Sequence, residues 1–84
     1  MKIVFSSNGW EDYLYWQQQD KQLLRRINLL IKEIQRHPFE GIGKPEPLRH
    51  NLTGYWSRRI DSKHRLVYKV EDDELWIVQC RDYY

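Results

Sequence analysis

Apolar side chains between residues 21 and 36 recur every three or four positions, which is the spacing of one helix face. They are Leu23, Leu24, Ile27, Leu30, Ile31 and Ile34. Asp20 precedes the run as a possible capping side chain, and Pro38 follows it, where the preceding residue is pushed out of the helical region. The pattern therefore predicts a helix over residues 21–36.

A shorter helix is predicted upstream. Trp10, Tyr13 and Leu14 share a narrow apolar face, and Asn8 with Glu11 three residues later has the form of a capping box. Residues 2–5 are mostly β-branched and aromatic and are followed by two serines, an asparagine and a glycine. This composition predicts a short strand and a turn before the helix.

The second half of the chain has the pattern of strands. Residues 39–47 contain two glycines and two prolines and predict a loop. Four runs separated by short turns follow at residues 49–52, 55–60, 64–70 and 75–80, and they look like strands. We therefore expect an α+β fold with residues 1–84 in a single domain. Two N-terminal helices would pack on one face of a mostly antiparallel sheet of about five strands, leaving the other face open to solvent.

The charge distribution is uneven. Six of the 14 Lys and Arg residues, but only two of the 12 acidic residues, lie between residues 44 and 65, although the whole chain has a net charge of only +2. Such a basic segment favours a polyanionic partner, and an open basic sheet face suits a nucleic-acid strand better than a small metabolite. A solvated basic face, or one that pairs with an acidic protein, fits the composition equally well.

Glu46 is the candidate for general base chemistry in this segment. Cleaving RNA without a metal requires a base for the 2′-OH proton, a cation for the phosphorane charge and an acid for the leaving 5′-oxygen. A carboxylate placed among Arg49, Arg58, Arg59 and Arg65 stays ionised. An exposed carboxylate can also form a passive ion pair, and composition favours that simpler interpretation. Strand alternation places Arg58 and Arg59 on opposite faces without showing which one faces a substrate.

The remaining reactive side chains suggest no cofactor. Cys80 is the single cysteine, which excludes an internal disulfide and fits a reducing compartment, and no spacing of cysteine and histidine predicts a zinc site. His37 fits a helix end, whereas His50 and His64 flank the basic strands and suit an acid or a substrate contact. We expect no signal peptide and no membrane span, and therefore a cytoplasmic protein.

Several aromatic residues adjoin the arginines and are candidates for stacking on RNA bases: Tyr55, Trp56, Tyr83 and Tyr84. The other tryptophans, Trp10, Trp16 and Trp76, are expected in the core or facing a protein partner.

Several blocks of the sequence resemble the YoeB toxins of the RelE toxin superfamily: WEDYLYW at residues 10–16, PFEGIGKPEPL at 38–48, WSRRI at 56–60, HRLVY at 64–68 and the terminal Tyr84. The resemblance implies a ribosome-dependent endoribonuclease that cuts mRNA in the decoding site. It also implies inhibition by a YefM-type antitoxin, formation of a homodimer, and binding of operator DNA through the toxin–antitoxin complex.

The resemblance assigns roles to individual residues. The expected catalytic residues are Glu46, Arg65, Tyr83 and Tyr84, and the expected RNA-binding residues are Lys44, Arg49, His50, Tyr55 and Arg59. Two positions depart from the family pattern, since Arg49 stands where lysine is usual and Tyr83 stands where YoeB toxins typically have a general-acid histidine. A phenol gives up its proton less readily than an imidazolium, so we expect Tyr83 to slow cleavage without affecting binding.

Two other interpretations stay open. One is a catalytically weakened, toxin-like subunit that acts mainly in antitoxin and operator binding. The other is a general RNA-binding domain, which would bind free RNA with a steep salt dependence and without a ribosome.

Overall fold

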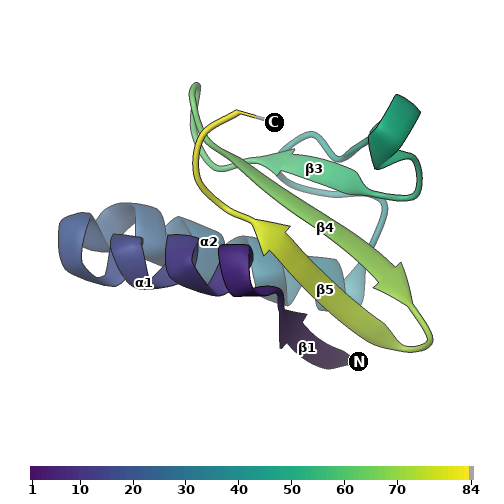
Figure 1. Ribbon diagram of the computed structural model, residues 1–84, viewed down its shortest axis with the longest axis horizontal. Helices are drawn as coiled ribbons and strands as arrows, with labels where there is room; N and C mark the ends of the chain where they lie inside the picture. Colours follow the sequence, from purple (N-terminus) through teal and green to yellow (C-terminus); the bar gives the residue numbers. More distant parts are fainter. Residues whose placement is uncertain (84) are drawn as a thin grey trace.

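The computed structural model describes residues 1–83, and Figure 1 shows its arrangement of helices and strands. In chain order the elements are β1 (Lys2–Phe5), α1 (Ser7–Gln19), α2 (Lys21–Arg36), β2 (Glu46–Pro47), a 3-10 turn (His50–Leu52), β3 (Trp56–Arg59), β4 (Arg65–Glu71) and β5 (Glu74–Gln79). The five strands form one sheet in the order β1-β5-β4-β3-β2. The predicted α+β fold is confirmed, with the two helices adjacent to each other and packed on the same face of the sheet.

The sheet is mixed rather than purely antiparallel. β3, β4 and β5 form the predicted antiparallel meander, and β2 adds to β3 in the antiparallel sense. β1 instead pairs parallel with β5, from Lys2 opposite Glu74 to Phe5 opposite Ile77. The parallel pairing follows from the topology, because the two helices of the crossover return the chain to the other edge of the sheet.

The predicted strand at residues 49–52 is wrong. His50 has a φ of 59°, which is in the left-handed region, and residues 50–52 form a 3-10 turn. The ladder between β2 and β3 covers only residues 46–47 and 56–57, and the Leu48 N–H donates to the Tyr55 carbonyl at 2.9 Å. The chain turns immediately beyond that bond, so residues 49–52 have no strand to pair with.

One predicted helix cap is confirmed, and another is wrong. The Asp20 side chain accepts hydrogen bonds from the N–H groups of Gln22 and Leu23, as its position before α2 predicted. The predicted capping box of Asn8 and Glu11 is wrong, because α1 begins earlier. Ser6 is its N-cap and accepts from the Gly9 N–H at 3.1 Å.

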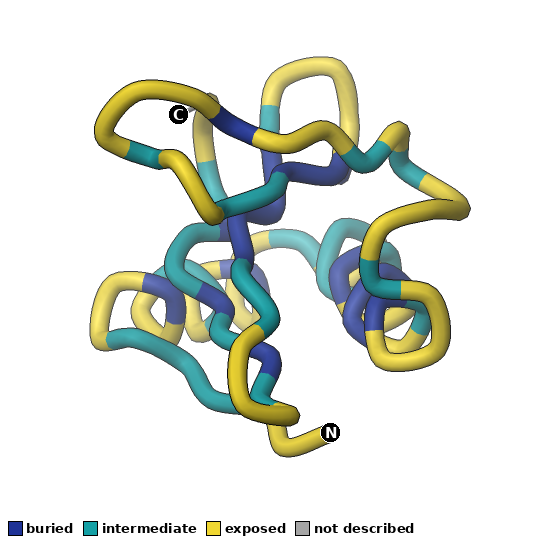
Figure 2. Tube along the Cα trace, turned by 90° about the vertical axis from the view of Figure 1, so that its right-hand side faces the viewer, coloured by how far each residue is buried: buried dark blue, intermediate teal, exposed yellow. Residues whose placement is uncertain are grey.

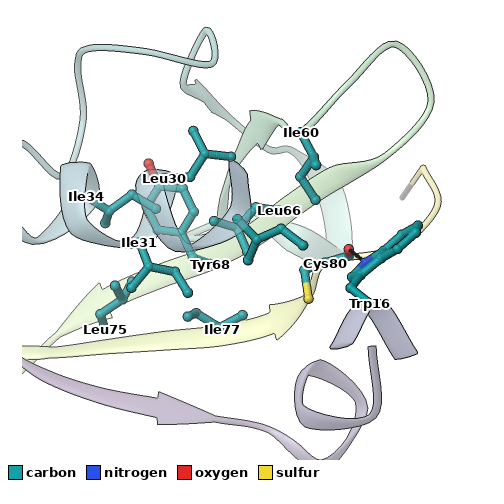
Figure 3. Packing of buried hydrophobic residues seen from close by; sticks show 11 residues of the cluster. Trp16, Leu30, Ile31, Ile34, Ile60, Leu66, Tyr68, Leu75, Ile77 and Cys80 are labelled. Atoms are coloured by element: carbon teal, nitrogen blue, oxygen red, sulfur yellow. Dashed lines mark hydrogen bonds between the residues drawn. The ribbon is translucent and has the colours of Figure 1, made fainter. Parts of the chain in front are cut away.

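The core lies between the helices and the sheet, where Figure 2 shows the buried segments. α2 contributes the largest share, with Ile27, Leu30, Ile31 and Ile34 packed against residues of β4 and β5. Figure 3 shows Leu30, Ile31 and Ile34 facing Leu66, Tyr68, Leu75 and Ile77, with Trp16 and Cys80 at one end of the cluster. This packing fixes the opposite face of the sheet, on which the candidate site lies. No helix among the described residues is long and apolar enough to cross a membrane.

Candidate functional site

The face of the sheet that points away from the helices brings three predicted site residues together. Glu46 in β2 is paired with Ser57 in β3, and Arg59, two residues further along β3, is paired with Arg65 in β4. Because alternate residues of a strand share a face, all four lie on the same side of the sheet. Glu46 and Arg65 are therefore separated by two strand spacings across the sheet and by two residues along it, roughly 12 Å at the backbone. Arg59 lies directly opposite Arg65 and diagonally from Glu46.

The two neighbouring arginines of β3 point to opposite faces of the sheet. Arg59 is exposed on the outer face, whereas Arg58 points to the core side and is completely buried. The Arg58 guanidinium donates to the carbonyls of His37, Glu40 and Ile42 and to the Tyr68 hydroxyl. The structure thus resolves the ambiguity left by the sequence: Arg59 is available to a substrate, and Arg58 holds the loop of residues 37–42.

This anchored loop leads directly to Glu46. Gly43, with a φ of 83°, follows the carbonyls bound by Arg58, and its own carbonyl accepts from the Arg59 N–H at 2.7 Å. A Cβ at Gly43 would stand 3.0 Å from Leu30 Cδ2 and 3.1 Å from Arg58 Cβ, so a side chain would crowd this contact. The loop is therefore fixed on both sides before the chain enters β2, which gives Glu46 a defined position.

Arg65 is 7% exposed and is held by backbone groups of the preceding turn. Its Nη1 donates to the carbonyls of Asp61 at 2.8 Å and His64 at 3.1 Å. The turn is closed by the Asp61 carboxylate, which accepts from the N–H groups of Lys63 and His64. Partial burial alone would raise the pKa of Asp61, but these N–H donors, with the nearby His64 and Arg65, lower it.

The C-terminal segment folds back over Arg65, so the outer face is less open than the sequence predicted. The Asp82 carbonyl accepts from the Arg65 N–H at 3.0 Å, and the Tyr83 ring lies 4.7 Å from the Arg65 guanidinium carbon. Gln79 Nε2 lies within hydrogen-bonding distance of the carbonyls of Arg81, Asp82 and Tyr83. The structure therefore brings the predicted acid, Tyr83, to the predicted transition-state cation. The fourth expected catalytic residue, Tyr84, lies outside the described residues.

The residues that follow Glu46 form one wall of the site. Residues 46–52 line an open pocket of about 670 Å³, which places Arg49 and His50 close to Glu46. Both side chains are exposed, as is that of Lys44, which precedes Glu46 with a φ of 51°. Three of the predicted RNA-binding residues are thus next to the predicted base.

The two predicted stacking residues at the start of β3 lie on opposite faces of the sheet. Tyr55 shares the outer face with Ser57 and Arg59, and Lys69 Nζ lies 5.5 Å from the Tyr55 ring centroid and 5.6 Å from the Trp76 ring centroid. Trp56 faces the core side of the sheet and packs against Phe39 with a centroid distance of 4.8 Å, so its assignment as a base-stacking residue is wrong. Alternation along β3 explains this position, since Trp56 shares the face of Arg58.

Sequence reasoning missed the residues that position the C-terminal segment. Trp16 Nε1 donates to the Cys80 carbonyl at 2.7 Å, which Figure 3 shows as a dashed line, and its ring packs edge-on against His64. Trp16 was expected only as a core or partner-facing residue, and Gln79 only as part of a strand. No local pattern signals the role of Trp16, because its contact joins segments far apart in the sequence. The contacts of Gln79 are local, with residues two to four positions later, but they depend on how the chain turns after β5.

Cys80 is buried and takes no part in the site. Burial raises the pKa of the Cys80 thiol to about 12, and the nearby Asp12 carboxylate adds to the effect. The thiol therefore stays protonated near neutral pH and is not a nucleophile. Within residues 1–83 no group of three or more histidine, cysteine or acidic side chains could hold a metal ion.

The chain matches known proteins over its whole length. The family model described as "YoeB-like toxin of bacterial type II toxin-antitoxin system" matches residues 5–84. Toxin YoeB of Synechocystis sp. is 64% identical over 84 residues, covering 100% of this chain and 98% of that protein. Toxin YoeB of Escherichia coli strain K12 is 60% identical, with both chains completely covered.

Solved structures show the same similarity in three dimensions. The YoeB/ParE toxin from Agrobacterium tumefaciens has a TM-score of 0.98 at 46% identity, with 100% of both chains covered. Structures of a YoeB–YefM complex and of a YoeB dimer, both from Staphylococcus aureus, have TM-scores of 0.92 and 0.93 at 50% and 52% identity. Each covers 100% of this chain and 98% of that one. The chain therefore belongs to the YoeB-like toxins of bacterial type II toxin–antitoxin systems.

Proposed function

We propose that this toxin is a ribosome-dependent mRNA endoribonuclease that cleaves without a metal. The observation that carries the proposal is the position of Glu46, Arg59 and Arg65 on one face of the sheet, with Tyr83 against Arg65. A base, two forked cations and an acid around one space are the groups that phosphodiester transfer to a 2′-OH requires.

In the proposed reaction Glu46 takes the proton of the 2′-OH, and the freed oxygen attacks the adjacent phosphorus. The bond between phosphorus and the 5′-oxygen breaks as the new bond forms. Arg59 and Arg65 stabilise the negative charge that develops on the phosphorane oxygens. Tyr83 supplies a proton to the departing 5′-oxygen, so the products are a 2′,3′-cyclic phosphate and a 5′-OH.

The requirement for a ribosome is consistent with the shape of the site. Glu46 and Arg65 stand roughly 12 Å apart at the backbone, and the pocket that residues 46–52 line beside Glu46 is open rather than enclosed. Holding the reacting groups in line supplies a large part of the catalytic effect. A ribosome that fixes the mRNA would provide the orientation that this face lacks.

The test is cleavage of a defined mRNA in a reconstituted translation reaction, with the 5′ ends of the products mapped. We expect discrete cuts within codons, cyclic phosphate termini, and no cut at a position carrying a 2′-O-methyl group. Glu46→Gln should lower the rate by at least about 100-fold, the usual minimum effect of removing a general base. Glu40→Gln is the matched control, because Glu40 is exposed in the preceding loop. The Glu40→Gln variant should cleave mRNA at the normal rate. Cleavage unaffected by Glu46→Gln would refute the proposal.

We also propose a YefM-type antitoxin and a second copy of this chain as partners. The Staphylococcus aureus relatives form a complex with YefM and a dimer. Exposed Ile3, Trp10 and Leu29 line a groove of about 700 Å³ between β1, α1 and α2, on the side away from Glu46, and this groove would receive the second copy. Binding of operator DNA is proposed through the antitoxin complex. An expressed chain that binds antitoxin but leaves growth unaffected would indicate the weakened subunit instead.

A further inference from the structure

We propose that His64 is a positioning residue for the nuclease reaction. Its ring nitrogen Nδ1 accepts a hydrogen bond from the Asp82 N–H at 2.7 Å, and this bond holds the C-terminal segment that carries Tyr83 against Arg65. The inference rests on the proposed function, because it concerns the delivery of the proposed acid. It assigns to His64 a role through the segment rather than on the substrate.

The His64 ring is itself held in place. It packs edge-on against the Trp16 indole, with a centroid distance of 4.8 Å and an interplanar angle of 77°, and its side chain is only 12% exposed. The same indole donates from Nε1 to the Cys80 carbonyl at 2.7 Å. One buried residue of α1 thus orients both the histidine and the start of the segment that the histidine binds.

The turn at Asp82 is held by hydrogen bonds on both sides of its peptide. Asp82 has a φ of 65°, in the left-handed region that a non-glycine residue enters only at a cost. The peptide is held from both sides, since the Asp82 N–H donates to His64 and the Asp82 carbonyl accepts from the Arg65 N–H at 3.0 Å. Without the acceptor on His64 one of these two restraints is lost, and the turn at Asp82 can relax.

The position of Tyr83 depends on that turn. Tyr83 follows Asp82 directly, is 60% exposed, and lies with its ring 4.7 Å from the Arg65 guanidinium carbon. Gln79 also contacts the segment, but through a single Nε2 shared among three carbonyls at 3.0 to 3.4 Å. The short bond to His64 is therefore the stronger restraint on where the Tyr83 hydroxyl stands.

This geometry also decides between two interpretations of His64 left open by the sequence. An imidazole whose Nδ1 accepts a hydrogen bond cannot donate a proton from that nitrogen. With Nδ1 engaged and its side chain largely covered, His64 is neither the acid nor a substrate contact. His64 provides a hydrogen-bond acceptor at a fixed position, and another side chain of suitable length can provide the same acceptor.

Two substitutions separate the acceptor from the ring. His64→Phe keeps an aromatic ring against Trp16 but removes the acceptor, whereas His64→Asn places a carbonyl oxygen near the position of Nδ1. We expect His64→Phe to lower kcat roughly tenfold with KM changed less than about twofold, and His64→Asn to restore kcat to within about threefold. Each is measured by mRNA cleavage on ribosomes, alongside thermal unfolding.

A double-mutant cycle tests whether the effect passes through the C-terminal segment. In a chain that ends at Asp82, and so lacks Tyr83 and Tyr84, His64→Phe should cause no further loss of cleavage. Amide hydrogen exchange adds a readout without RNA: the Asp82 N–H should exchange at least about tenfold faster in His64→Phe and at the original rate in His64→Asn.

Several results would overturn the inference. Unchanged kcat and Asp82 exchange in His64→Phe, or an equal loss of activity in the shortened chain, would show that His64 does not act through the segment. If His64→Phe fails to fold, His64→Gln replaces it, because its oxygen reaches the Nε2 position and should not restore activity as asparagine does. If the original chain does not cut mRNA, the proposed function fails, while Asp82 exchange still tests the hydrogen bond.

Discussion

The buried guanidinium of Arg58 predicts a large difference between two adjacent arginines. Arg58→Met keeps an unbranched side chain in the core but removes the donors to three loop carbonyls and to Tyr68. Hydrogen bonds to a charged group contribute about 1.5–3 kcal/mol each, and carbonyls left without a partner add a further cost. Some of these carbonyls are partly exposed and recover water, so we expect a net loss of about 4 kcal/mol.

This loss is a large fraction of the total free energy of unfolding. A domain of 84 residues has a free energy of unfolding of roughly 4–13 kcal/mol, so Arg58→Met would leave a marginal fold. Urea unfolding followed by tryptophan fluorescence measures the change, at equal protein concentrations because dimerisation would add to stability. The midpoint should fall with little change in slope, and a drop of this size should lower Tm by at least about 15 °C.

Arg59→Met is the matched control. Arg59 is exposed, and its backbone bonds to Gly43 and Arg26 survive the substitution, so the free energy of unfolding should change by less than about 0.5 kcal/mol. Cleavage of mRNA should be impaired all the same, since Arg59 faces the proposed substrate. A loss below about 1 kcal/mol in Arg58→Met, or equal losses in both variants, would refute the assignment of Arg58 as the loop anchor.

Three further outcomes are expected. Tyr83→His should raise the rate of mRNA cleavage roughly tenfold without changing antitoxin affinity, and equal rates would show that the phenol is not limiting. Cys80, whose pKa is raised to about 12 by burial, should react with a thiol reagent at pH 8 at least ~10³-fold more slowly than in urea-unfolded chain. Trp10→Lys should weaken the proposed homodimer by at least about 100-fold in sedimentation experiments, and an unchanged dimer would place the interface elsewhere.

The regular elements could be predicted because local pattern and packing agree. The spacing of Ile27, Leu30 and Ile34 specifies the α2 face that is buried, and Asp20 caps that helix as its position suggested. The meander of β3, β4 and β5 likewise follows from runs separated by short turns. The predicted strand at residues 49–52 failed because the ladder between β2 and β3 ends at Pro47, which leaves these residues no strand to pair with.

Only part of the candidate site could be predicted from the sequence. The family pattern assigned Glu46, Arg59 and Arg65, and the register places them on one face, but the sequence could not separate Arg58 from Arg59. That choice depends on which side of β3 faces α2, a fact of tertiary packing. The contacts of His64 and Trp16 with the C-terminal segment were not predicted, because they join residues that are 18 and 64 positions apart in the sequence.

The parallel pairing of β1 with β5 affects the time at which the protein becomes able to act. The first strand cannot complete the sheet until residues 74–77 are present, almost a full chain length later. Contacts of such long sequence separation form late in folding. During synthesis the sheet that carries Glu46 and Arg65 therefore stays incomplete until residues 74–77 have left the exit tunnel of the ribosome. We expect the nascent toxin to be inactive until that point.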